Sequence, residues 1–138
     1  MHESEMVSVE TCGYWTVRDL MAHVLSWDEE IYRTVKHWTG ARDWQDGALY
    51  DDEWNEREVN ARAALDVIDL ADGLATYHRR TLQFCDSAAP ADLVVVARAP
   101  WGESMALLSL LYEMAGHDAV HRADIETMRG TTPRSRAR

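Results

Sequence analysis

Three segments of the chain place apolar residues at the spacing of an amphipathic α-helix, and this pattern constrains the fold more than any other feature. They run over residues 17–35, 67–85 and 107–125. Apolar residues three or four positions apart share one face of a helix, which must be buried against another element. We therefore predict an all-α fold, a helix bundle built on three long helices.

Signals at the ends of the first stripe set the expected boundaries of its helix. Thr16 and Asp19 have the spacing of a capping box at the start of a helix. Gly40 follows the last periodic residue, so this helix should end near Trp38. A loop is then expected to residue 52, and a polar helical segment over residues 53–64.

The second and third stripes are joined by a connector with turn signals. The run Leu93 to Ala97 has strand-like residues but no second strand to pair with, so we expect an extended connector. A turn is expected at Pro100 to Gly102. The last helix should run from about Glu103 to Met128, with Gly130 ending it.

Length and charge narrow the class of protein. The 138 residues suit one domain, residues 1–128, followed by a basic tail at residues 129–138 that we expect to be disordered. A formal net charge of -10 disfavours nucleic acid as a partner. No apolar run is long enough to span a membrane, and Cys12 and Cys85 give no disulfide framework. These features predict a cytoplasmic protein without a membrane or nucleic-acid partner.

Histidines at helical spacing are the clearest sign of chemistry. His117 and His121 lie four residues apart, on one face of the expected last helix, and His23 lies at the edge of the first stripe. Three convergent imidazoles with open positions are a usual frame for a reactive divalent metal. The spacing alone is a weak signal. The alternative is a set of partly buried histidines on packing faces.

Two carboxylate residues lie near the face of the expected last helix that carries the histidines. Glu113 precedes His117 by one turn, and Asp124 follows His121 by three residues. Either could orient an imidazole or add a ligand. For Glu113 this role and an ordinary surface position are equally favoured, whereas for Asp124 we favour the surface position. The other histidines, His2, His37 and His78, are not assigned to the site.

Three sequence motifs together resemble a known family. They are Trp15-Thr16-Val17-Arg18-Asp19 followed by His23-Val24, then Trp54-Asn55-Glu56-Arg57, then Gly116-His117-Asp118-Ala119-Val120-His121. The first and third resemble the tryptophan-containing and HxxxH motifs of the DinB-like superfamily. The second is similar to its ClbS/DfsB subgroup. The resemblance runs from about Cys12 to Met128.

The resemblance implies an up-down four-helix bundle, often a homodimer, that binds a divalent metal, most often zinc or nickel. Position by position, the implied ligands are His23, His117 and His121. Mycothiol-dependent maleylpyruvate isomerases are relatives, but their last motif is similar to ExxxH, with glutamate where this chain has His117. Many members also carry an acidic residue where this chain has Val120.

The family's first helix precedes the tryptophan motif, and here it is absent or very short. We expect the absence to leave an apolar groove that a second copy or a rearranged segment covers. The alternative is that the native chain is longer and carries an additional N-terminal helix.

Two functions are compatible with these features. The first is a metal-dependent transferase or hydrolase that detoxifies a small reactive electrophile or toxin, with a low-molecular-weight thiol as a candidate substrate. In this case Glu113 is the candidate general base, and Trp27, Trp54 or Trp101 could wall the pocket. The alternative is a non-catalytic ligand-binding or structural helix bundle in which the histidine cluster is vestigial or structural.

Overall fold

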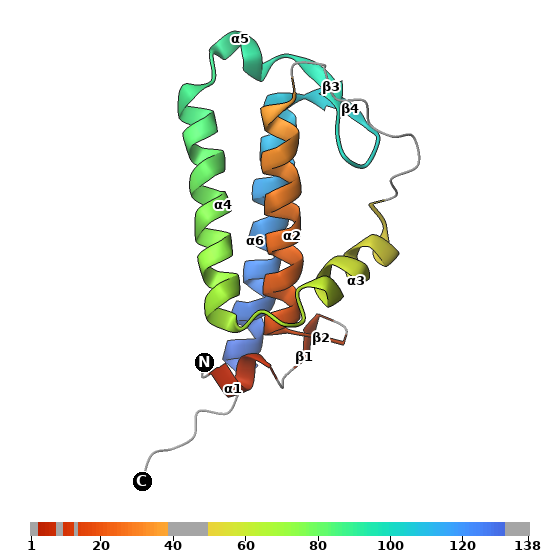
Figure 1. The fold of residues 1–138 in the computed structure, drawn as a ribbon, viewed down its shortest axis with the longest axis vertical. Helices are drawn as coiled ribbons and strands as arrows, with labels where there is room; N and C mark the ends of the chain where they lie inside the picture. The colour runs from red at the N-terminus through yellow and green to blue at the C-terminus, as the bar shows by residue number, and fades with distance from the viewer. Residues whose placement is uncertain (1–2, 8–9, 13, 39–49, 132–138) are drawn as a thin grey trace.

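A computed structural model describes residues 3–7, 10–12, 14–38 and 50–131 of the chain (Figure 1). Three long helices dominate it: α2 (Val17–Lys36), α4 (Val67–Ser87) and α6 (Leu107–Thr131). The all-α helix bundle predicted from the periodicity is confirmed. Among the described residues, no helix combines the length and apolar character required to cross a membrane.

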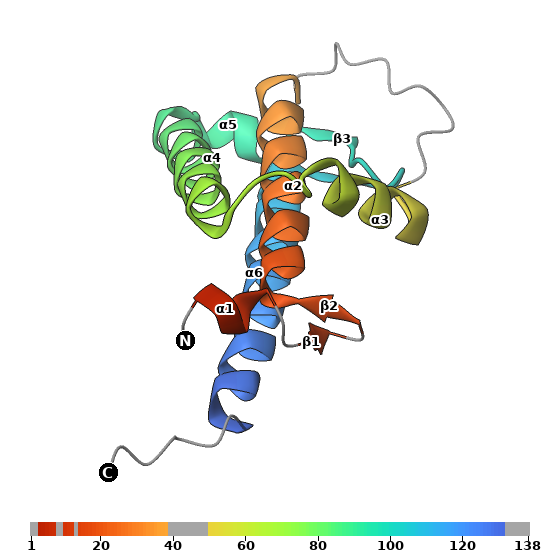
Figure 2. The same cartoon turned by 60° about the horizontal axis from the view of Figure 1, so that its bottom comes forward.

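Helix α2 is the centre of the bundle. It packs against α4, α6 and the shorter α3 (Asp52–Ala61), and Figure 2 shows α4 and α3 on two sides of α2. Apolar residues on two faces of α2 therefore enter two core clusters. The first joins α2 to α6 and contains Trp27, Ile31, Val35, Trp38, Ala99, Leu107, Leu110 and Met114. The second joins it to α3 and α4 and contains Ala22, Leu25, Val59 and Leu70.

Capping residues begin α2 and α4. The Thr16 side chain accepts a hydrogen bond from the Asp19 backbone, and the Asp19 carboxylate accepts one from the Thr16 backbone, so the predicted capping box is confirmed. Asp66 and Asp69 form the same arrangement before α4. Helix α2 ends at Lys36, close to the expected boundary, whereas Gly40 and the expected loop up to residue 49 lie outside the described residues.

A β-hairpin replaces the expected extended connector after the short helix α5 (Pro90–Leu93). Strands β3 (Val96–Arg98) and β4 (Ser104–Ala106) pair antiparallel. The prediction that the connector has no partner strand is therefore wrong. The partner lies in residues that were assigned to the start of the last helix, which begins at Leu107. Gly102 has φ +91, which lets the chain reverse in the predicted turn.

The described residues before α2 contain little helix. Helix α1 (Glu3–Met6) has four residues and is followed by a small antiparallel pair, β1 (Glu10–Cys12) and β2 (Trp15–Thr16). The expectation of a very short first helix is thus confirmed for the described residues. At the other end, α6 continues through Gly130 to Thr131, so Gly130 does not end it. The remainder of the expected tail lies outside the described residues.

Candidate metal centre

The three predicted histidines come together between α2 and α6. His23 is buried on α2, and His117 and His121 lie half-buried on successive turns of α6. The Nε2 atom of His117 lies 3.1 Å from that of His23 and 3.2 Å from that of His121. Potential ligand atoms of all three residues lie within 4.8 Å of one another. Side chains that are 94 residues apart in sequence therefore share one site.

The distances between these nitrogens match those around a bound metal ion. Zn–N bonds of about 2.0–2.1 Å in a tetrahedral site place two ligand nitrogens about 3.3 Å apart. Hydrogen bonds alone cannot account for both contacts of His117 Nε2. A neutral Nε2 carries either one proton or one lone pair, so it can serve as a partner in one such bond but not in two. A shared cation satisfies all three nitrogens, and these residues therefore fit a divalent metal.

Burial also keeps the rings in the form that binds metal. The pKa of His23 is lowered to about 3, first by burial and then by the neighbouring rings of His117 and His121. Burial, and then His117, likewise lower the pKa of His121. A neutral imidazole offers a lone pair to a cation, whereas a protonated one does not. At neutral pH, His23 therefore needs no deprotonation before it can bind a metal.

Carboxylates on α6 lie beside the outer nitrogens of two rings. Asp124 Oδ2 is 3.3 Å from His121 Nδ1. Asp118 Oδ1 is 3.5 Å from His117 Nδ1, and both of these atoms are buried without a hydrogen bond. Such carboxylates orient metal-binding imidazoles. The surface position favoured for Asp124 is therefore a wrong prediction, because a residue three positions further along the helix lies next to the ring.

Trp15 covers one side of the cluster. Its ring lies 4.8 Å from that of His23, centroid to centroid. The indole Nε1 donates a hydrogen bond of 2.9 Å to Glu56 Oε1 on α3, which also accepts one from the Tyr14 hydroxyl. Helix α3 thereby fixes the tryptophan that packs on the buried histidine.

A second group of aromatic residues lies beside His117. The Trp27 ring centroid is 6.1 Å from that of His117, 4.8 Å from that of Trp54 and 6.1 Å from that of Trp101. Trp27 Nε1 donates a hydrogen bond of 3.1 Å to Asn55 Oδ1. The motif Trp54-Asn55-Glu56 was noted in the sequence only for its family resemblance. In the structure it holds Trp15 and Trp27, the two tryptophans that pack beside the histidines.

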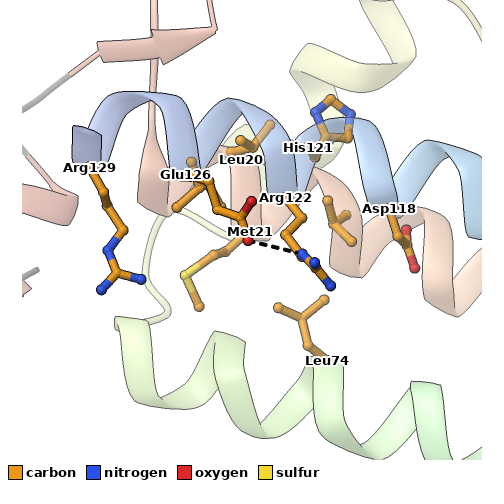
Figure 3. Close-up of a pocket in the computed structure, with 10 residues that line it drawn as sticks. Leu20, Met21, Leu74, Asp118, His121, Arg122, Glu126 and Arg129 are labelled. Carbon is orange, nitrogen blue, oxygen red and sulfur yellow. Dashed lines mark hydrogen bonds and ion pairs between the residues drawn. The ribbon is translucent and has the colours of Figure 1, made fainter. Parts of the chain in front are cut away.

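A cavity of about 390 Å³ opens between α2, α4 and α6 and reaches His121 (Figure 3). Its apolar lining consists of Leu20, Met21, Val24, Leu74 and Ile125. Its charged lining consists of Asp118, Arg122, Glu126 and Arg129. None of the three tryptophans predicted to wall the pocket is among its lining residues. Trp27 lies beside His117 instead, with Trp54 and Trp101 against it. The cavity can take a small, mainly apolar molecule next to the histidine cluster.

Asp28 is a candidate functional residue that the sequence analysis missed. Burial raises its pKa to about 7, and the charges of Asp118 and Glu29 add to this effect. A carboxyl group that exchanges its proton near neutral pH suits acid–base chemistry. Glu113, the predicted general base, is exposed on α6. The sequence offers no signal for Asp28 beyond its place at the edge of the apolar stripe.

Comparison with known protein families shows which family the chain resembles. The model of the DinB superfamily matches residues 2–125, which is most of the chain. The chain therefore belongs to the DinB superfamily, as its motifs predicted. Neither a search of curated proteins nor a search of solved structures gives a significant match. The three histidines that could hold a metal lie within the matched residues.

Proposed function

We propose that this protein is a divalent-metal-dependent enzyme of small molecules, a thiol transferase or hydrolase that acts on a reactive electrophile or toxin. The observation that carries the proposal is the convergence of His23, His117 and His121, with Nε2 atoms 3.1 and 3.2 Å apart. Among the described residues, the cluster offers three ligand side chains. Three protein ligands are typical of catalytic metal sites, because a position is left for water or substrate.

The proposed chemistry divides between the metal and the chain. A bound zinc or nickel ion would lower the pKa of a coordinated water or thiol. The aliphatic side chains in the cavity beside His121 would bind the apolar part of the substrate and exclude water from it. Asp28 interacts electrostatically with Asp118, which lies beside His117, and its pKa of about 7 would allow it to accept or return the proton of the nucleophile. Glu113 stays the alternative for this role.

Metal analysis of the purified protein tests the proposal. After refolding with zinc or nickel, we expect about one ion per chain, as for a site with three protein ligands. His121→Ala should lose most of this metal. His78→Ala, a histidine of α4 outside the cluster, should retain it. A wild-type protein without metal after refolding would contradict the proposal.

The second candidate is a non-catalytic bundle with a structural or vestigial histidine cluster. Val120 favours it, since many relatives carry an acidic residue at this position and here an apolar side chain is 59% exposed. Thermal denaturation with and without a chelator separates the two functions. A structural metal contributes to folding, so its removal should lower the Tm strongly. A catalytic metal should be removable with a small change of Tm.

Location and partners follow as further proposals. We propose a cytoplasmic protein, because two cysteines give no disulfide framework and the described helices include none that could cross a membrane. The net charge of -10 leads us to propose that nucleic acid is not a partner.

A further inference from the structure

A second cavity, of about 210 Å³, lies between the last turns of α2 and the middle of α4. Basic and aromatic side chains make up most of its lining. Arg33 and Lys36 come from α2 and Arg80 from α4, and Tyr32 and Tyr77 complete the wall. The two tyrosine rings meet edge to face, with centroids 5.9 Å apart. This cavity is separate from the one that reaches His121.

Two of the cations at this cavity contact aromatic rings. Lys36 Nζ lies 5.4 Å from the centroid of the Tyr32 ring. Arg80 Cζ lies 5.7 Å from the Tyr32 ring and 5.1 Å from the Tyr77 ring. Among the described residues, neither cation lies within ion-pair distance of a carboxylate. This is unusual for a chain with 24 acidic and 14 basic residues.

The one carboxylate in the lining is already neutralised. Glu29 Oε2 lies 2.6 Å from Arg62 Nη2, on a partly buried arginine. Arg33 is paired with Glu30 at 3.0 Å. The exposed His37 also borders the cavity. The net charge at the cavity is therefore positive, in a molecule that is otherwise strongly acidic.

Interaction with a helix dipole explains the positions of Arg33 and Lys36 but not that of Arg80. Arg33 and Lys36 occupy the last turn of α2, where cations stabilise the carbonyl end of a helix. Arg80 comes from the interior of α4, seven residues before its end at Ser87, so no helix end accounts for its position. Tyrosine rings hold its guanidinium at the cavity, where the planar donor group can bind an oxyanion with two hydrogen bonds.

Size and charge define the ligand. We propose that this cavity binds a small phosphate monoester, with the phosphate between Lys36 and Arg80 and the organic part against Tyr32 and Tyr77. Its volume is below the range of about 300–1,000 Å³ typical of drug-sized ligands, which restricts the organic part to a small group. Tyr32 follows His23 by nine residues on α2, a rise of about 13 Å. The site is thus distinct from the metal centre.

The single lysine of the chain makes a direct test possible. The full-length protein is acetylated by an amine reagent, and modification of Lys36 is measured by mass spectrometry relative to that of the N-terminal amine. Phenyl phosphate should slow the acetylation of Lys36, whereas chloride at equal ionic strength should not. Inorganic phosphate in a parallel reaction distinguishes a phosphate monoester from free phosphate, since only the ester can contact the tyrosine rings. Equal effects of chloride and phenyl phosphate would overturn the proposal.

Variants show whether the protection belongs to this cavity. Arg80→Gln should abolish the protection of Lys36, whereas Arg79→Gln, a neighbouring exposed arginine outside the lining, should preserve it. Calorimetric titration with phenyl phosphate provides a second measurement. Loss of a charge-assisted contact in Lys36→Gln should weaken binding about tenfold. Equal behaviour of the Arg79 and Arg80 variants would also overturn the proposal. Metal content plays no part in this test, so its result is independent of the proposed enzyme function.

Discussion

His117 is the residue on which the candidate metal centre depends most, because its Nε2 atom contacts the Nε2 atoms of both other histidines. His23 contributes a ring whose pKa is about 3, so it stays neutral over the physiological range. The buried neutral ring makes the folded protein less stable at acidic pH. The unfolded ring takes up a proton near its ordinary pKa of 6.5, whereas the folded ring does not, so the contribution to stability is full above 6.5 and lost as pH falls towards 3.

Asp28 should give the metal-free protein the opposite dependence on pH. Its pKa is raised from 3.8 to about 7, so the folded state holds the proton more tightly than the unfolded state. The resulting stabilisation is full below 3.8 and is lost as pH rises through about 7. Replacing Asp28 by Asn removes the charge that is buried at higher pH. We therefore expect Asp28→Asn to raise the Tm at about pH 8 by several degrees, and less at about pH 5.

The control for this prediction is Glu113→Gln. Glu113 is exposed, so its replacement should change the Tm little. Melting curves followed by circular dichroism at the two pH values measure the effect. The Tm difference between Asp28→Asn and the wild type should be larger at the higher pH value. An equal difference at the two pH values would show that the carboxyl group of Asp28 does not titrate between them in the folded protein.

At the scale of elements, the close approach of α2 and α4 depends on Gly73. A Cβ atom at this position would lie 2.9 Å from Leu25 Cδ2 and 3.1 Å from Leu25 Cδ1. Leu25 is buried in the core cluster that joins the two helices, so its side chain has little room to move. The glycine that weakens α4 as an isolated helix therefore allows α4 to pack on α2.

Two glycine substitutions separate helix propensity from packing. Gly116→Ala on α6 meets no atom within 4 Å and should raise the free energy of unfolding by about 0.5–1 kcal/mol. Gly73→Ala gains the same propensity but must displace Leu25, at a cost of about 1–3 kcal/mol. We expect a net loss of stability, measured by urea denaturation. Equal stabilisation by both substitutions would show that α4 can move away from α2 without penalty.

At the scale of the whole molecule, the long helix α4 is only partly covered by other helices. Helix α4 packs on α2, and among its residues only Leu70 is fully buried. Ile68 and Leu82 on α4 are 65% and 52% exposed, and Tyr112 on α6 is 73% exposed. Such apolar exposure on a small domain favours association. With the very short α1, it is consistent with the homodimer that the family resemblance implies.

We propose that the protein forms a homodimer in solution. Light scattering coupled to size-exclusion chromatography should give about twice the 15.8 kDa mass of the chain, as expected for the commonest closed assembly. A monomeric mass at every concentration, for a protein that melts cooperatively, would contradict this prediction and would show that the exposed apolar side chains are tolerated in water.

The sequence by itself determined the helices and singled out the three histidines of the candidate metal centre. Apolar spacing and the Thr16–Asp19 capping box are local signals, so α2, α4 and α6 could be predicted within a few residues. Only the tertiary structure decided what depends on contacts distant in sequence. Examples are the pairing of β3 with β4, the burial of Asp28 near Asp118, and the position of α3 behind the tryptophans. These features depend on how segments distant in sequence pack together and on the loss of water around buried groups. Neither produces a periodic pattern in the sequence. The same holds for the candidate metal centre, since spacing places His117 beside His121, but only the crossing of α2 and α6 brings His23 to them.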